Sequence, residues 1–157
     1  MKYKCVNKLD KFGFQDAGII SCNYKDDTLS LELEGMIAKY DNPHNQKFED
    51  CYITATQIRF KEAKIIRFFL EGAKYYDAND VFLEEVPDTD ILPEAYMETI
   101  EKLINGVVFM VREKSTAQDE NKCCMIAIDV EEDTYWLEME YEKVVVEWDR
   151  FMNKVQP

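Results

Sequence analysis

The chain has 157 residues, of which 46% are hydrophobic, and its formal net charge is −13. This length fits one domain with a substantial core, and the apolar content excludes an intrinsically disordered chain. The charge excludes nucleic acid and anionic membrane surfaces as expected partners, because lysine and arginine supply most of the affinity for phosphate groups.

Two segments of similar sequence, residues 20–34 and 126–140, are predicted to form hairpins. Apolar and polar residues alternate in both with a period of two, which is typical of half-buried strands. The acidic stretches 25–28 and 131–134 are predicted turns, because Asp and Thr side chains bond nearby backbone groups. The match is either an internal repeat or the result of shared physical constraints, and both explanations stay open.

The segment between the hairpins predicts further strands and one helix. A polar loop covers residues 40–47. Strands are expected over residues 52–60, 64–71, 81–86 and 107–112, the last of them buried on both faces as in a central strand. Proline at position 93, apolar residues at helical spacing and Gly106 at the end predict a helix over residues 93–105 that covers one face of the sheet.

After a polar loop over residues 115–122, the strands 123–130, 134–140 and 143–151 are predicted to complete a meander. Trp148 alternates with valines in the last strand and is expected in the core. The fold class that follows is α+β, with a strongly twisted antiparallel sheet or partly closed barrel packed by one main helix. We expect a single domain over residues 1–157.

No motif in the sequence predicts a reaction, a metal or a cofactor. The one histidine, His44, lies in a polar loop with Asp41 nearby but no marked nucleophile. Residues 77–80 and 88–90 supply oxygen ligands, yet neither continues into the twelve-residue calcium pattern. The cysteines lack the paired spacings of a zinc site, and the glycines form no phosphate-binding loop. We expect no catalytic residue, and a binding protein rather than an enzyme.

The five cysteines also predict the compartment. Their number is odd, and their positions, 5, 22, 51, 123 and 124, follow no disulfide framework. This is typical of reduced thiols in the cytosol. The first residues have no apolar run of the kind found in a secretory signal, and no apolar stretch is long enough to cross a bilayer. These features predict a cytoplasmic protein.

Both hairpins carry glutamates on the face opposite their apolar residues. Glu32 and Glu34 in the first match Glu138 and Glu140 in the second, and we expect all four to face solvent. Trp136 takes the place of a serine in the first hairpin. A tryptophan exposed among acids is typical of a protein interface, unless a loop or the helix covers it. These five residues are the candidate interaction surface.

Residues 14–20, Phe-Gln-Asp-Ala-Gly-Ile-Ile, and the alternating strand 27–33 resemble the opening of several small bacterial β-rich families. These families start with a Phe-His-Asp-Ala-x-Ile-like segment. Many lack a known function, and some are immunity proteins of polymorphic toxin systems. The chain has Gln15 where such families often have histidine. The resemblance implies a β-rich fold and a protein partner, and it carries over no site residue.

Two functional hypotheses follow from the sequence. The first is a binding protein for a basic protein, similar to an immunity protein, because acidity favours a basic partner. Homodimerisation through an edge strand or the Trp136 face is a related possibility. The second is a small-ligand-binding or enzymatic β-barrel-like domain, in which a curved sheet encloses a pocket rich in tyrosine and phenylalanine.

Overall fold

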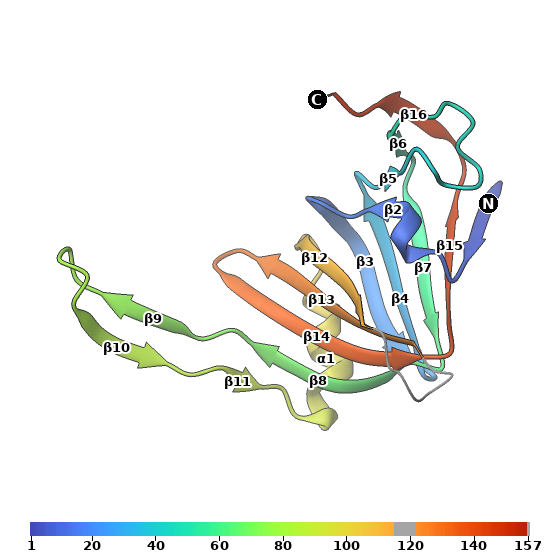
Figure 1. Cartoon of the computed structure of the whole chain (residues 1–157). Helices are drawn as coiled ribbons and strands as arrows, with labels where there is room; N and C mark the ends of the chain where they lie inside the picture. The colour runs from blue at the N-terminus through green and yellow to red at the C-terminus, as the bar shows by residue number, and fades with distance from the viewer. Residues whose placement is uncertain (115–121, 157) are drawn as a thin grey trace.

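The computed structural model describes residues 1–114 and 122–156, which form a strongly curved antiparallel sheet with a long protruding hairpin (Figure 1). Strands make up 58% of the described residues, so the described fold is mostly β. The large sheet contains ten strands in the spatial order β1 (Tyr3–Val6), β15 (Lys143–Trp148), β7 (Thr56–Lys61), β4 (Thr28–Glu34), β3 (Ala17–Lys25), β12 (Val107–Lys114), β13 (Lys122–Val130), β14 (Asp133–Tyr141), β8 (Lys64–Leu70) and β11 (Thr89–Asp90).

Two smaller sheets and three short helical segments complete the described structure. A four-stranded sheet contains β16 (Phe151–Lys154), β6 (Cys51–Ile53), β5 (Ile37–Ala38) and β2 (Phe12–Gly13), and a two-stranded one contains β10 (Phe82–Val86) and β9 (Ala73–Tyr76). The 3-10 segments are η1 (Leu9–Lys11) and η2 (Pro93–Ala95), and the α-helix is α1 (Tyr96–Glu101). No helix in the described part of the chain has the length and apolar character needed to cross a membrane.

The large sheet folds over so that its two halves, β1 to β3 and β12 to β11, face each other. The halves are joined edge to edge by only two residue pairs between β3 and β12. The chain also crosses between the halves at Glu62-Ala63, from β7 to β8, and at Glu142, from β14 to β15. A link as short as Glu62-Ala63 spans at most roughly 10 Å, so the strands that it joins lie about as far apart as two packed sheets. The core therefore lies between the halves.

The core side chains come from the inner faces of both halves. They include the largest fully buried residues, namely Trp148, Tyr141, Phe60, Phe68, Leu29, Leu33, Met36, Ile53, Ile58, Ile100, Leu103 and Ile126. The predicted burial of Trp148 is confirmed, with 0% of its surface exposed. The sheet is not closed, because β1 and β11 are its edge strands. Of the two predicted alternatives, the twisted antiparallel sheet is therefore the one that the structure has.

The predicted helix over residues 93–105 is much shorter in the structure. Residues 93–95 form a 3-10 turn and α1 has six residues. Beyond Glu101 the backbone bonds run from residue i to i−3, as from the Leu103 amide to the Ile100 carbonyl. This tighter winding turns Ile104 outward, where it is 42% exposed. Ile100 and Leu103 are buried against β3, where the Cys22 thiol donates to the Ile100 carbonyl at 2.7 Å.

Two predicted strands, residues 52–60 and 143–151, are each divided in two by a shared bend. The Thr54 hydroxyl accepts hydrogen bonds from the amides of Asp149 and Arg150 at 3.2 and 3.1 Å. Beyond the bend, β6 pairs with β16 in the small sheet, as β7 pairs with β15 in the large one. Both chain segments therefore pass from the large sheet to the small one at the same bend. The alternation of residues within one strand does not predict such a bend.

The predicted C-terminal meander is also wrong in its last step. Strands β13 and β14 pair as predicted, but β15 crosses to the other half and pairs with β7 and β1. The expected burial of residues 107–112 on both faces is wrong too. Strand β12 is central in order, yet Val107 and Phe109 are 36% and 60% exposed, because nothing described covers its outer face. The predicted loop 115–122 lies, except for Lys122, outside the described residues.

Both hairpins exist, but they differ in register. The first turns at Asp26-Asp27 and the second at Glu131-Glu132, one position earlier in the aligned sequences. Moving the turn by one residue shifts each residue's cross-strand partner by two positions. Because side chains alternate with a period of two, the same residues still face the core. A bulge between Ile19 and Ser21 reverses the alternation in the first hairpin. Ile20, expected to point inward, is therefore 40% exposed.

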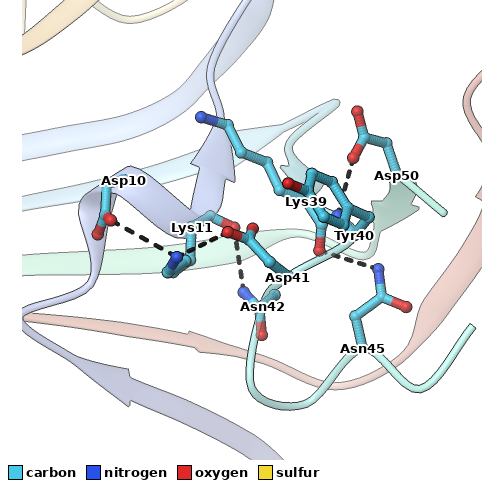
Figure 2. Close-up of polar contacts among 8 residues, drawn as sticks. All are labelled: Asp10, Lys11, Lys39, Tyr40, Asp41, Asn42, Asn45 and Asp50. Carbon is cyan, nitrogen blue, oxygen red and sulfur yellow. Dashed lines mark hydrogen bonds and ion pairs between the residues drawn. The ribbon is translucent and has the colours of Figure 1, made fainter. Parts of the chain in front are cut away.

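The loop before β6 is held by buried amide side chains (Figure 2). The Asn45 side chain donates to the carbonyls of Ala38, Lys39 and Glu49 at 3.2, 3.1 and 2.8 Å. The Asn42 side chain donates to the Lys11 carbonyl at 3.2 Å. These bonds add to backbone ones, since the Lys39 carbonyl also accepts from the Asn42 amide and the Lys11 carbonyl from the Lys39 amide. This polar loop is therefore part of the folded structure.

Replacing Asn45 by alanine is expected to lower the free energy of unfolding by about 2–3 kcal/mol, because it removes three hydrogen bonds from the side chain to backbone carbonyls of the loop. Urea unfolding followed by circular dichroism measures this. Asn79→Ala, at an exposed turn, is the matched control and should change stability by less than about 0.5 kcal/mol. Equal losses in the two variants would contradict the role given to Asn45.

Candidate protein-interaction surface

A hairpin projects far from the rest of the molecule (green in Figure 1). We call residues 71–88, which contain β9 and β10, the arm. Every residue from 73 to 88 is exposed, and no arm residue belongs to the hydrophobic core. The arm therefore adds no buried apolar surface to the fold.

The arm nevertheless carries large apolar side chains on both faces. Six are about half exposed or more: Tyr75 at 49%, Tyr76 at 54%, Val81 at 56%, Phe82 at 52%, Leu83 at 61% and Val86 at 47%. Tyr76 and Phe82 pair across the strands with their ring centroids 5.9 Å apart. So many large apolar side chains exposed in one segment are unusual in a monomer and typically mark an interaction site.

The tip of the arm is a compact turn closed by Asp77. Its carboxylate accepts hydrogen bonds from the amides of Asn79 and Val81 at 2.8 and 3.0 Å. At the other end of the arm the Asp88 carboxylate accepts from the Gly72 amide at 2.8 Å. Both segments considered as calcium ligands thus use a carboxylate to hold a backbone turn.

The base of the arm contains Trp136. Its indole ring stacks on Phe69 of β8, with centroids 6.4 Å apart, and its N–H donates to the Glu71 carboxylate at 3.2 Å. The Arg67 guanidinium lies 4.0 Å from the Phe69 ring centroid on the same strand. Trp136 is half-buried. We call Arg67, Phe69, Glu71 and Trp136 the base cluster.

The arm is also strongly acidic. It has six carboxylates and one lysine, a net charge of −5 within the −13 of the whole chain. An isolated two-stranded hairpin is marginally stable in water, and its outer edges leave backbone groups unpaired. Its apolar side chains, free edges and negative charge suit a partner that covers the arm and carries positive charge.

The five predicted surface residues do not form one patch. Glu138 and Glu140 lie on β14 with it, whereas Glu32 and Glu34 lie on β4, and three strands separate β4 from β14 in the sheet. Glu138 is ion-paired with Lys114 at 3.0 Å, which neutralises its charge. The structure thus brings Trp136 to the arm and leaves Glu32 and Glu34 on the other half.

His44 and Asp41 have structural neighbours. The His44 imidazole lies 2.9 Å from the Lys4 carbonyl and packs near Tyr3 and Trp148, with centroids 5.5 and 5.7 Å away. Asp41 is ion-paired with Lys11 at 2.7 Å (Figure 2), which lowers the pKa of its carboxyl through the hydrogen bond. Among the described residues, no three His, Cys, Asp or Glu side chains are grouped to hold a metal ion.

All five cysteines are buried and free. Burial raises the pKa of the Cys22 thiol to about 11, and it also raises the pKa values of Cys124 and Tyr141. A thiol in an unfolded chain has a pKa of about 8.5, so the folded state holds these protons more tightly. The stabilisation is complete below that value and is lost as the pH rises through the folded-state pKa.

The urea midpoint of unfolding is therefore expected to fall between pH 8 and pH 10.5. Cys22→Ala removes one such thiol and should show a smaller fall over the same range. Midpoints measured by tryptophan fluorescence at both pH values provide the comparison. If wild type and variant lost stability equally, Cys22 would not contribute to the alkaline sensitivity.

Comparisons of the chain with protein-family models, with curated proteins and with solved structures found no match. The geometry of the arm is therefore the basis for a functional assignment. Sequence reasoning predicted a strand at residues 81–86 but missed the arm. The signal was present, because the polar turn 77–80 separates Tyr75-Tyr76 from Val81-Phe82-Leu83, which is a hairpin pattern.

Proposed function

We propose that this protein is a protein-binding domain whose arm docks against the basic surface of a partner protein. The observation that carries the proposal is an exposed hairpin with six large apolar side chains and no role in the core. Covering such side chains releases water from apolar surface and provides the main driving force of association. The arm contributes no residue to the hydrophobic core, so stabilising the fold does not explain its apolar side chains.

The charge of the arm supports a basic partner. A net charge of −5 on a slender projection attracts positive surfaces over about one Debye length, which raises the association rate and makes it depend on salt. The same charge disfavours a homodimer in which two arms lie against each other, since like charges repel across an interface.

A toxin neutralised by an immunity-like protein is one form of this complex, in keeping with the resemblance of residues 14–20 and 27–33. The buried free thiols support a cytoplasmic location. The alternative of a ligand-binding or enzymatic barrel has less support, because the sheet has two free edges and its inner faces are filled by core side chains.

Photocrosslinking tests the proposal. A benzoylphenylalanine placed at Phe82 is expected to give one discrete adduct with a basic protein in cells that produce both. The matched control is the same residue at Phe109, which is 60% exposed but lies on β12. The purified partner should bind wild type with an association rate that falls at least tenfold between 50 and 300 mM salt.

A variant in which two glycines replace residues 73–86 should lose this binding and keep its far-ultraviolet circular dichroism and thermal midpoint. Two results would overturn the proposal. One is an adduct pattern at Phe82 no different from that at Phe109. The other is full affinity for the partner after removal of the arm.

A further inference from the structure

A second surface, separate from the arm, is lined by apolar residues, carboxylates and glycines. It is a cleft of about 800 Å³ bounded by the start of β3, the end of β4, the bend between β6 and β7, and the start of β12. Its lining includes Asp16, Glu34, Tyr52, Val107 and Met152. This volume is within the range of natural ligand sites.

The cleft is lined by glycines and tightly turned backbone. Three of the five glycines of the chain, Gly18, Gly35 and Gly106, lie along it. Gly35 has a φ of 80°, and Asp16 and Asn105, which also line the cleft, have φ values of 61° and 68°. Gly18 and Gly35 have no side chain to keep a bound chain away from the protein backbone. At Gly106 a side chain would instead point at the Leu103 carbonyl and Val130, inside the fold.

The two carboxylates of the cleft have no cationic partner in the described structure. Six ion pairs occur among the described residues, and none includes Asp16 or Glu34. Neither side chain accepts a hydrogen bond there, in contrast to the carboxylates of Asp41 and Glu138. Both therefore remain available to a positively charged group from outside.

The rim supplies apolar contact surface. Tyr52 is 37% exposed, Val107 is 36% exposed and Met152 is 51% exposed. An aromatic face attracts a cation, and a methionine side chain adapts to irregular apolar shapes. A lysine or arginine has both an apolar stem and a charged end, so it complements a carboxylate beside such a rim.

We propose that this cleft binds an extended peptide segment of a partner protein, with a lysine or arginine set between apolar residues. Asp16 and Glu34 pair with the cationic side chain. Tyr52, Val107 and Met152 contact the flanking apolar residues, and the glycine-lined floor accepts the peptide backbone. The proposal depends on charge complementarity and on the shape of the cleft, and not on the arm.

The test is an NMR titration of the full chain with acetyl-Leu-Lys-Leu-Arg-Leu-amide, beside acetyl-Leu-Glu-Leu-Glu-Leu-amide as the matched control peptide. The basic peptide is expected to shift the amide signals of Gly18, Gly35 and Gly106, and the acidic peptide is not. The double variant Asp16→Asn with Glu34→Gln should weaken binding about fivefold. Glu142→Gln, which removes an exposed carboxylate between β14 and β15, should leave binding unchanged.

A further measurement distinguishes peptide binding in the cleft from partner binding by the arm. The variant lacking residues 73–86 is expected to bind the basic peptide as wild type does, so either proposal can fail alone. Acetyl-lysine-methylamide is expected to bind at least tenfold more weakly than the peptide, and equal binding would indicate a site for free amines instead. The proposal would be overturned if the basic peptide did not shift the glycine signals, or if the acidic peptide shifted them equally. It would also be overturned if the double variant bound the basic peptide as wild type does.

Discussion

Phe60→Ala is expected to lower the free energy of unfolding by about 3–5 kcal/mol. Phe60 is 1% exposed, lies opposite Leu29 and Val144 in the neighbouring strands, and meets the Tyr141 ring edge to face at 5.0 Å. Its removal leaves a cavity between the two halves of the sheet, where close packing prevents the neighbours from filling the space.

The matched substitution is Phe82→Ala on the arm. Phe82 is 52% exposed and lies outside the core, so its loss should change stability by less than about 1 kcal/mol. Urea denaturation of both variants at pH 7 provides the measurement. A large loss from Phe82→Ala would mean that the arm packs on the fold in solution, and it would remove the main argument for a docking role.

Gly106→Ala is expected to cost about 2–3 kcal/mol. An added Cβ would lie 2.8 Å from the Leu103 carbonyl oxygen and 2.9 Å from a methyl carbon of Val130. The Gly106 carbonyl also accepts from the Ile19 amide at 2.8 Å, so a shift here disturbs the link between the two halves of the sheet. Backbone oxygen cannot move aside as a flexible side chain can.

Gly18→Ala is the control, because it changes another glycine of the same cleft. The three heavy atoms nearest to its Cβ would all belong to the Glu34 side chain, the first at 3.4 Å, which is ordinary contact. The expected change in stability is below about 1 kcal/mol. Thermal unfolding of the two variants compares them directly. Similar midpoints would show that the chain around Gly106 yields more easily than its contacts indicate.

The alternation in the sequence correctly predicted several strands and much of the core. Leu29, Leu31 and Leu33 are buried in β4, and Leu137 and Met139 are buried in β14. This succeeded because side chains of a strand alternate between its faces whatever the strand pairs with. The prediction failed at Ile20, where a bulge changes the count by one residue.

The candidate site was predicted only in part. Trp136 was selected as an exception in an otherwise polar face, and it does lie at the base of the arm. The arm itself was not predicted, because Tyr75, Phe82 and Leu83 have the composition of buried residues. Nothing local distinguishes an apolar strand that enters a core from one that extends into solvent.

The sequence by itself determined the acidity, the hairpins with their buried faces, and the absence of a known catalytic pattern. These depend on composition and on residues close together in the chain. Only the tertiary structure decided that β15 leaves β14 for β7, that the arm projects, and that three distant glycines line one cleft. Each of these results from pairing between segments far apart in sequence, and a period of two gives each strand its face but not its partner.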